Sequence, residues 1–192
     1  MTHADAVEFL SHARPAPGFW ADVGAGTGTF TRALAELIGH TGTVFAIDRD
    51  ADALRRAEQS TDRRRARIVH VRGDMTDLAL IRELDGVMLT GALFANALHF
   101  TARPDRVLDM AAGRLTPDGR IVVIEYDRDE PNPWVPHPLP FSSLSEVARE
   151  AGLAEPRRVA ERPSRYHRTM YCAVMRAGRD PGGADVHGGR HA

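Results

Sequence analysis

The chain has 192 residues, of which 43% are hydrophobic and 27% are charged, and this length suits one compact domain with a substantial core. Its 25 basic and 26 acidic side chains give a formal charge of -1, which predicts no general attraction to nucleic acid or to an anionic membrane. All the basic side chains except histidine are arginines, so a Schiff-base lysine, the Gly-Lys-Ser/Thr phosphate loop and a lysine general base are excluded.

The cysteine content and the hydropathy indicate the compartment. Cys172 is the single cysteine, so it forms no internal disulfide, and no signal-like segment opens the sequence. The longest nearly apolar stretch, Gly86 to Phe100, is shorter than the roughly 20 residues that span a bilayer. We therefore expect a cytoplasmic protein that does not associate with membranes.

Apolar runs punctuated by glycine and proline predict alternating helices and strands. In the first half we expect a helix within 5–10, a strand at 19–23, a helix at 30–38, a strand at 43–47, a helix at 51–59, a strand at 66–71, a short helix near 78–84 and a strand at 86–89. In the second half we expect a helix at 104–115, a turn at 117–119, a strand at 120–125, a helix at 142–151 and strands near 157–161 and 169–175.

The predicted strands are almost continuously apolar, and this is typical of a parallel sheet that helices cover on both faces. The expected fold class is therefore a doubly wound, Rossmann-like α/β fold. Ligands of such sheets bind beyond the carboxyl ends of the strands, so the loops that follow each strand are the candidates for a functional site.

The most specific motif is a glycine-rich loop, Asp22-Val-Gly24-Ala-Gly26-Thr-Gly28, between the first predicted strand and its helix. Glycines at this place let the backbone approach a ligand closely. A nicotinamide dinucleotide fingerprint needs Gly or Ala where this chain has Thr29, which weakens that reading.

Two carboxylates follow the next two predicted strands. Asp48 lies about 20 residues beyond the glycines, where a carboxylate accepts hydrogen bonds from the ribose hydroxyls of an adenosine-type ligand. Asp74 lies past the third strand and can accept from an exocyclic amine such as that of adenine. Arg49 and Met75 follow these acids directly, and we expect them at the same rim.

Over residues 18–176, these motifs make the chain resemble small stand-alone class I S-adenosylmethionine-dependent methyltransferases. The resemblance implies that the glycine loop holds the methionine part of the cofactor, that Asp48 binds its ribose and that Asp74 meets its adenine amine. Arg49 departs from the apolar residue often found there, although a guanidinium plane can also stack on adenine. The family also implies a seven-stranded sheet whose last strand, residues 169–175, runs antiparallel.

By the same resemblance we expect one methyltransferase domain over residues 1–177, with residues 1–15 as an N-terminal lid helix and residues 178–192 as a disordered tail. The expected partner is a small-molecule methyl acceptor, and we expect no metal and no nucleic acid. Ala95-Asn96-Ala97-Leu98 lacks the Asn/Asp-Pro-Pro motif of adenine and amide methyltransferases. Whether the protein is a monomer or a homodimer is left open.

The acceptor is expected to lie against the loops that follow the fourth and fifth strands. His99 is the best candidate for a general base, because imidazole titrates near neutral pH, and its alternative is a packing role. Asn96, three residues earlier, would lie beside His99 or would cap the local turn. Tyr126 follows the fifth strand and completes the predicted catalytic set.

A proline-rich segment, Pro131 to Pro140, follows the fifth strand and is expected to be stiff and extended. It either forms a wall that offers Trp134 to an apolar or aromatic acceptor, or it is a linker that plugs the core with Trp134.

Three functions remain open on the sequence. The leading one is methyl transfer from S-adenosylmethionine to a small molecule by in-line displacement, for which alignment matters more than a catalytic triad. A nicotinamide-dependent oxidoreductase shares the fold but would lack its Tyr-x-x-x-Lys pair here. A cofactor-binding scaffold without turnover is the third.

Overall fold

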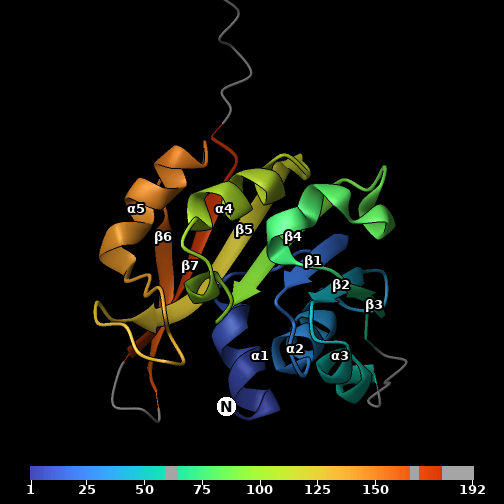
Figure 1. Cartoon of the computed structure of the whole chain (residues 1–192). Helices are drawn as coiled ribbons and strands as arrows, with labels where there is room; N and C mark the ends of the chain where they lie inside the picture. The colour runs from blue at the N-terminus through green and yellow to red at the C-terminus, as the bar shows by residue number, and fades with distance from the viewer. Residues whose placement is uncertain (59–64, 165–168, 179–192) are drawn as a thin grey trace, which may run out of the picture.

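The computed structural model, described here for residues 1–58, 65–164 and 169–178, is built on one seven-stranded sheet with helices on both faces (Figure 1). The strands are β1 (Phe19–Val23), β2 (Thr43–Asp48), β3 (Arg67–Arg72), β4 (Leu89–Ala95), β5 (Leu115–Asp127), β6 (Arg157–Pro163) and β7 (Thr169–Arg176). Their order across the sheet is β3-β2-β1-β4-β5-β7-β6.

Strands β3, β2, β1, β4 and β5 run parallel, and β7 pairs antiparallel with both β5 and β6. The predicted doubly wound fold is therefore confirmed, including the antiparallel last strand. The chain reverses its winding between β1 and β4, and in open α/β sheets this crevice is where ligands bind.

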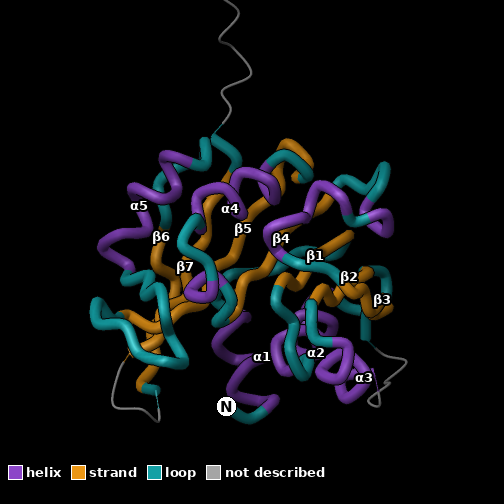
Figure 2. Tube along the Cα trace, in the orientation of Figure 1, coloured by secondary structure: helices purple, strands orange, loops and turns teal. Residues whose placement is uncertain are grey.

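Helices α1, α2 and α3 lie on one face of the sheet, and α4 and α5 lie on the other (Figures 1 and 2). Their bounds are α1 (His3–Ser11), α2 (Thr29–Ile38), α3 (Ala51–Glu58), α4 (Pro104–Ala112) and α5 (Phe141–Glu150). Three short 3-10 segments, η1 (Met75–Leu80), η2 (Arg82–Leu84) and η3 (Leu98–Phe100), follow β3 and β4. No described helix is long and apolar enough to cross a membrane.

The core has two layers, because alternate residues of each strand point to opposite faces of the sheet. Trp20 and Val44 are buried with α1 and α2, whereas their neighbours Ala21 and Phe45 are buried with the opposite cluster. Nearly all of β4 and the centre of β5 are buried, which explains why their sequences are apolar on both sides.

The structure corrects three local predictions. The fourth strand occupies 89–95 instead of 86–89, because the chain turns at Gly86 (φ +71°) and joins the sheet only at Leu89. The helix predicted near 78–84 is two 3-10 segments that bury Leu78 and Leu84. The predicted turn at 117–119 is an irregularity within β5, where the register against β4 shifts.

Helix α1 is packed into the fold along most of its length. Thr2 and Asp5 form a capping box at its start, and Phe9 and Leu10 are buried in the same cluster as Leu34 of α2. Only the N-terminal end of α1 reaches the rim of the sheet, where Met1 and Asp5 line a cavity. Its function as a lid stays a prediction. The predicted disordered tail falls almost wholly outside the described residues.

Candidate functional site

A cavity of about 330 Å³ lies at the carboxyl ends of β1 to β4. It is lined by Gly24, Ala25, Gly26, Asp48, Arg49, Gly73, Asp74, Met75, Ala95, Asn96, Ala97 and Phe100. Six of the eight residues predicted to bind the cofactor are in this set, although they come from three separate strand ends. The fold therefore brings together residues that the sequence spreads over 52 positions, from 24 to 75.

The glycine turn forms one wall of this cavity with bare backbone. Gly24 has φ +78°, and a Cβ there would lie 2.6 Å from the Cβ of Ala97, so no larger residue fits without movement. The amides of Gly24 and Ala25 both donate to the carbonyl of Ile47, which holds the turn against β2. A Cβ on Gly26 would meet nothing within 4 Å, because this position opens into free space.

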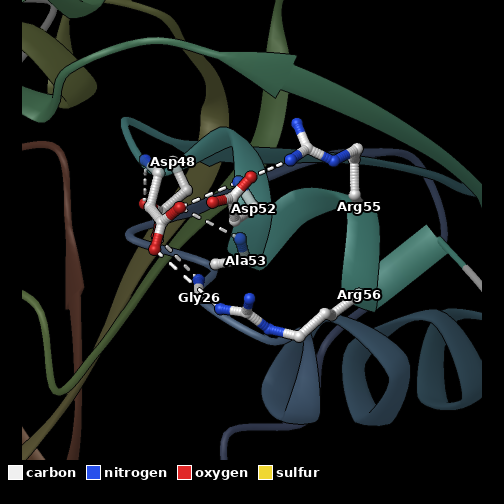
Figure 3. A network of polar contacts seen from close by, with 7 residues as sticks. Gly26, Asp48, Asp52, Ala53, Arg55 and Arg56 are labelled. Carbon is white, nitrogen blue, oxygen red and sulfur yellow. Dashed lines mark hydrogen bonds and ion pairs between the residues drawn. The ribbon is translucent and has the colours of Figure 1, made fainter.

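Asp48 lies directly against the glycine turn (Figure 3). Its Oδ2 accepts from the amide of Gly26 at 2.7 Å, and its Oδ1 accepts from the amide of Asp50 at 2.8 Å. These two bonds fix the carboxylate, and each oxygen keeps a further lone pair for a ligand hydroxyl. The arrangement matches the expected pairing of a ribose acid with the glycine loop.

Asp74 lies at the next strand end and begins η1. Its Oδ1 accepts from the amide of Thr76 at 3.0 Å and from the Thr76 hydroxyl at 2.9 Å. The bond from the Thr76 amide is the main reason that the pKa of Asp74 is lowered, and the charge of Arg49 acts in the same direction. Asp74 is therefore ionised at neutral pH, and its Oδ2, which has no partner among the described residues, can accept from an amine.

Two of the predicted cofactor-binding residues do not line this cavity. Asp22 is 1% exposed and accepts from the Thr31 hydroxyl at 2.5 Å. Burial raises the pKa of Asp22 to about 7 against the opposing Thr31 bond, and the charge of Asp48 adds to the rise. Gly28 begins α2 with φ +77°, where a Cβ would come within 2.9 Å of Ala57. Both residues shape the loop, and their direct contact with a cofactor stays a prediction.

A second cavity, of about 580 Å³, adjoins the first one and shares Asn96 and Phe100 with it. It is lined by Asn96, His99, Phe100, Tyr126, Arg128, Asn132, Trp134 and Val135. The three predicted catalytic residues, His99, Asn96 and Tyr126, are all in this set. The two cavities together offer room for a cofactor and an acceptor side by side.

His99 lies in the second cavity with its ring held from behind. Its Nδ1 is 2.7 Å from Oε2 of Glu125, and Glu125 Oε1 accepts from the amides of Leu98 at 2.9 Å and of His99 at 3.3 Å. Glu125 is 1% exposed and lies outside the cavity lining. A neutral His99 ring that donates from Nδ1 to the Glu125 carboxylate keeps its lone pair on Nε2.

Asn96 lines three cavities. The third of them has a volume of about 410 Å³ and lies beside the N-terminus of α1. The backbone of Asn96 has φ +55°, which is uncommon outside glycine, and its Oδ1 is buried without a hydrogen-bond partner. A buried unpaired oxygen is costly unless a ligand satisfies it. Asn96 and His99 line the same cavity, and their catalytic roles stay a prediction.

The proline-rich segment forms a wall of the second cavity. Trp134 is 78% exposed and lines the cavity, so the reading of Trp134 as a core plug is wrong. Val135, Leu139 and Pro140 are the residues of this segment that are buried. The Oδ1 of Asn132 accepts from the amides of Trp134 and Val135. These two bonds fix the local turn of the segment.

Sequence reasoning missed four contributors to these cavities or their support. One of them is Glu125, which lies behind His99 and outside the cavity lining. An acid that ends the apolar run of β5 already indicates a buried partner. Phe100, Arg128 and Asn132 were not predicted, because only the fold shows which loop side chains turn inward.

The first cavity fits the cofactor that the resemblance implies. Gly26 leaves open space beside the backbone, where the amino-acid end of a nucleoside can lie. Asp48 and Asp74 supply acceptors for ribose hydroxyls and for the adenine amine at successive strand ends. These residue types suit S-adenosylmethionine, because a negatively charged 2'-phosphate would be repelled by Asp48.

The comparisons with known proteins point the same way. A family model described as "Methyltransferase domain" matches residues 21–119. A relative from Shewanella oneidensis, "Ribosomal RNA small subunit methyltransferase H", is 35% identical over 77 residues, covering 38% of this chain. That match spans 25% of the relative, so the chain matches only about a quarter of its length.

Two solved structures share the fold at low sequence identity. An arsenic(III) S-adenosylmethionine methyltransferase from Chlamydomonas reinhardtii has a TM-score of 0.67 at 19% identity, covering 85% of this chain and 64% of that one. Magnesium protoporphyrin IX methyltransferase from Synechocystis, solved with bound S-adenosylmethionine, has a TM-score of 0.60 at 12% identity, covering 90% and 76%.

Proposed function

Since this chain belongs to the methyltransferase-domain family and is an S-adenosylmethionine-dependent methyltransferase, we propose that it methylates a hydroxyl oxygen of a small molecule bound in the second cavity. The observation that carries the proposal is the His99–Glu125 pair, in which Nδ1 lies 2.7 Å from the carboxylate and the ring lines the cavity next to the cofactor cavity. Family membership also removes the nicotinamide-dependent oxidoreductase from consideration.

The first cavity would hold the cofactor through the glycine turn, Asp48 and Asp74. When bound, S-adenosylmethionine supplies an electrophilic methyl group on a sulfonium, whose displacement leaves a neutral sulfide. Because the leaving group is neutral, the protein mainly aligns the acceptor and excludes water, which contributes about 7–11 kcal/mol in well-oriented reactions.

His99 would take the proton of the acceptor. As the new oxygen–methyl bond forms and the sulfur–methyl bond breaks, Nε2 accepts the hydroxyl proton, and the resulting imidazolium is stabilised by the Glu125 carboxylate at Nδ1. The unpaired Oδ1 of Asn96 would accept a hydrogen bond at the junction of the cavities and orient what is bound there. Phe100, 51% exposed, would close the boundary between the two cavities.

A small acceptor is supported by the size and walls of the second cavity. About 580 Å³ is within the usual range for small-molecule sites, and aromatic rings line it from η3, from the end of β5 and from the proline-rich segment. The rRNA methyltransferase relatives share only part of the chain and make RNA the competing acceptor. The formal charge of -1 gives no general attraction to RNA, and Arg65 is paired with Glu36 at 3.1 Å.

Transfer of a radiolabelled methyl group tests this proposal. The full-length protein is incubated with methyl-labelled S-adenosylmethionine and either a panel of small phenols and alcohols or purified small-subunit ribosomal RNA. We expect label in a small product with a mass increase of one methylene, and loss of that label in His99→Ala. Label in RNA alone would contradict the proposal, and binding of the cofactor without any transfer would favour the scaffold.

A further inference from the structure

Arg128 lines the second cavity and has no side-chain partner in the part of the chain that the structure describes. It directly follows β5, is half-buried and lines the cavity, and its Nε is buried without a hydrogen-bond partner. Within the described ranges no ion pair joins its guanidinium to a carboxylate. A partly buried, unpaired guanidinium is costly, and a negatively charged ligand would offset that cost.

The acids nearest to Arg128 in the sequence are committed elsewhere or face solvent. Asp127 pairs with Arg158 at 3.2 Å, and Glu125 accepts three hydrogen bonds around His99. Asp129 is exposed. Among the described residues that line the cavity, Arg128 is the one side chain with a permanent charge.

Asn132 adds donors at the same wall. Its Oδ1 is occupied by the amides of Trp134 and Val135, at 2.9 and 2.8 Å, so the Nδ2 group is the part left for a ligand. Neither Arg128 nor Asn132 lines the cofactor cavity. Donors therefore gather on the segment that leaves β5, away from the boundary that Asn96 and Phe100 form.

His99, the proposed proton acceptor, lies nearer the boundary between the two cavities. The ring of His99 is 4.3 Å from the ring of Phe100, which both cavities share, and 6.1 Å from the ring of Tyr126. The second cavity thus has the His99 ring near its boundary with the first cavity and the N–H donors of Arg128 and Asn132 on the segment that leaves β5. Trp134, which lies between Asn132 and Val135 in the sequence, adds the flat apolar surface of its exposed ring to the cavity.

From this polarity we propose that the methyl acceptor is a planar hydroxy acid, whose carboxylate binds Arg128 and Asn132 while its hydroxyl faces His99. One guanidinium and one neutral amide match a singly charged, planar carboxylate, which guanidinium groups bind through two parallel hydrogen bonds. A phosphate ester, with up to two charges, would leave charge unpaired at this wall. The inference rests on the proposed function and names its substrate class.

Calorimetric titration of the full-length protein, saturated with S-adenosylhomocysteine, tests this class. The probes are 2-, 3- and 4-hydroxybenzoate, each compared with the corresponding neutral hydroxybenzamide, and phenyl phosphate is included as the competing anion. We expect at least one carboxylate to bind about tenfold or more tightly than its amide, as lost charge-assisted hydrogen bonds predict, and more tightly than phenyl phosphate. Arg128→Gln should bring the carboxylate-to-amide ratio to within about twofold.

Arg149→Gln is the matched control, because Arg149 is 72% exposed on α5, away from the cavity lining, and should keep the wild-type ratio. A wild-type protein that binds no carboxylate better than its amide, or an Arg128→Gln variant that keeps the preference, overturns the inference. If wild type methylates a neutral phenol without this preference, the proposed function stands and the substrate class is wrong. If S-adenosylhomocysteine itself does not bind, both fall.

Discussion

Replacing Glu125 by glutamine probes the catalytic geometry with little change in volume. Glutamine can still accept the amide hydrogen of Leu98, but its own amide nitrogen then faces His99 Nδ1, where Glu125 Oε2 now lies at 2.7 Å. Two donors would meet there, so the imidazole adopts the other tautomer and carries its hydrogen on Nε2. The nitrogen that faces the acceptor would no longer be a base.

The expected loss is the contribution of a general base, a factor of about 10² to 10⁴ in rate. The assay is single-turnover methyl transfer with saturating cofactor, together with titration of S-adenosylhomocysteine, whose affinity should not change because Glu125 does not line the first cavity. Glu146→Gln, on the exposed face of α5, is the control for removing one acid. A Glu125→Gln rate within about threefold of wild type would refute the general-base reasoning.

Two further changes test the support of the cofactor cavity. Gly24→Ala should weaken S-adenosylhomocysteine binding and lower stability by about 1–3 kcal/mol in thermal unfolding, because its Cβ would clash with Ala97 at a positive φ, and unchanged values would contradict the close approach. The pKa of Asp22 is raised from 3.8 to about 7 in the folded protein. Between these values the folded protein keeps a proton that the unfolded chain releases. The free energy of unfolding should therefore fall by up to about 4 kcal/mol as the pH rises from 4 to 7. In Asp22→Asn this part of the fall should be absent in urea unfolding measured at pH 5 and pH 8.

Much of the fold was predictable because periodicity and turn residues are local signals. β1 was predicted with its observed bounds, and β7 within one residue, since each is an apolar run between clear breaks. The fourth strand was placed too early, because the apolar stretch from Gly86 to Phe100 contains no internal break. Which part of such a run enters the sheet is decided by pairing with β1 and β5.

The cofactor cavity was predicted better than the acceptor cavity for a physical reason. Backbone approach needs glycine, and ribose recognition needs an acid, so Gly24, Gly26 and Asp48 leave a visible pattern. The acceptor cavity instead depends on loops that run over the rim. Nothing local in the sequence indicates that Arg128 turns into the cavity.

The most direct test of the account is the affinity of the full-length protein for S-adenosylmethionine and its dependence on Asp48. We expect wild type to bind one equivalent, and Asp48→Ala to bind about 5 to 150 times more weakly, because about 1–3 kcal/mol of acceptor contacts would be lost. Asp52→Ala, on the exposed side of α3, should bind like wild type. Absence of binding by wild type, or equal affinity of Asp48→Ala, would contradict the assignment of the cofactor site.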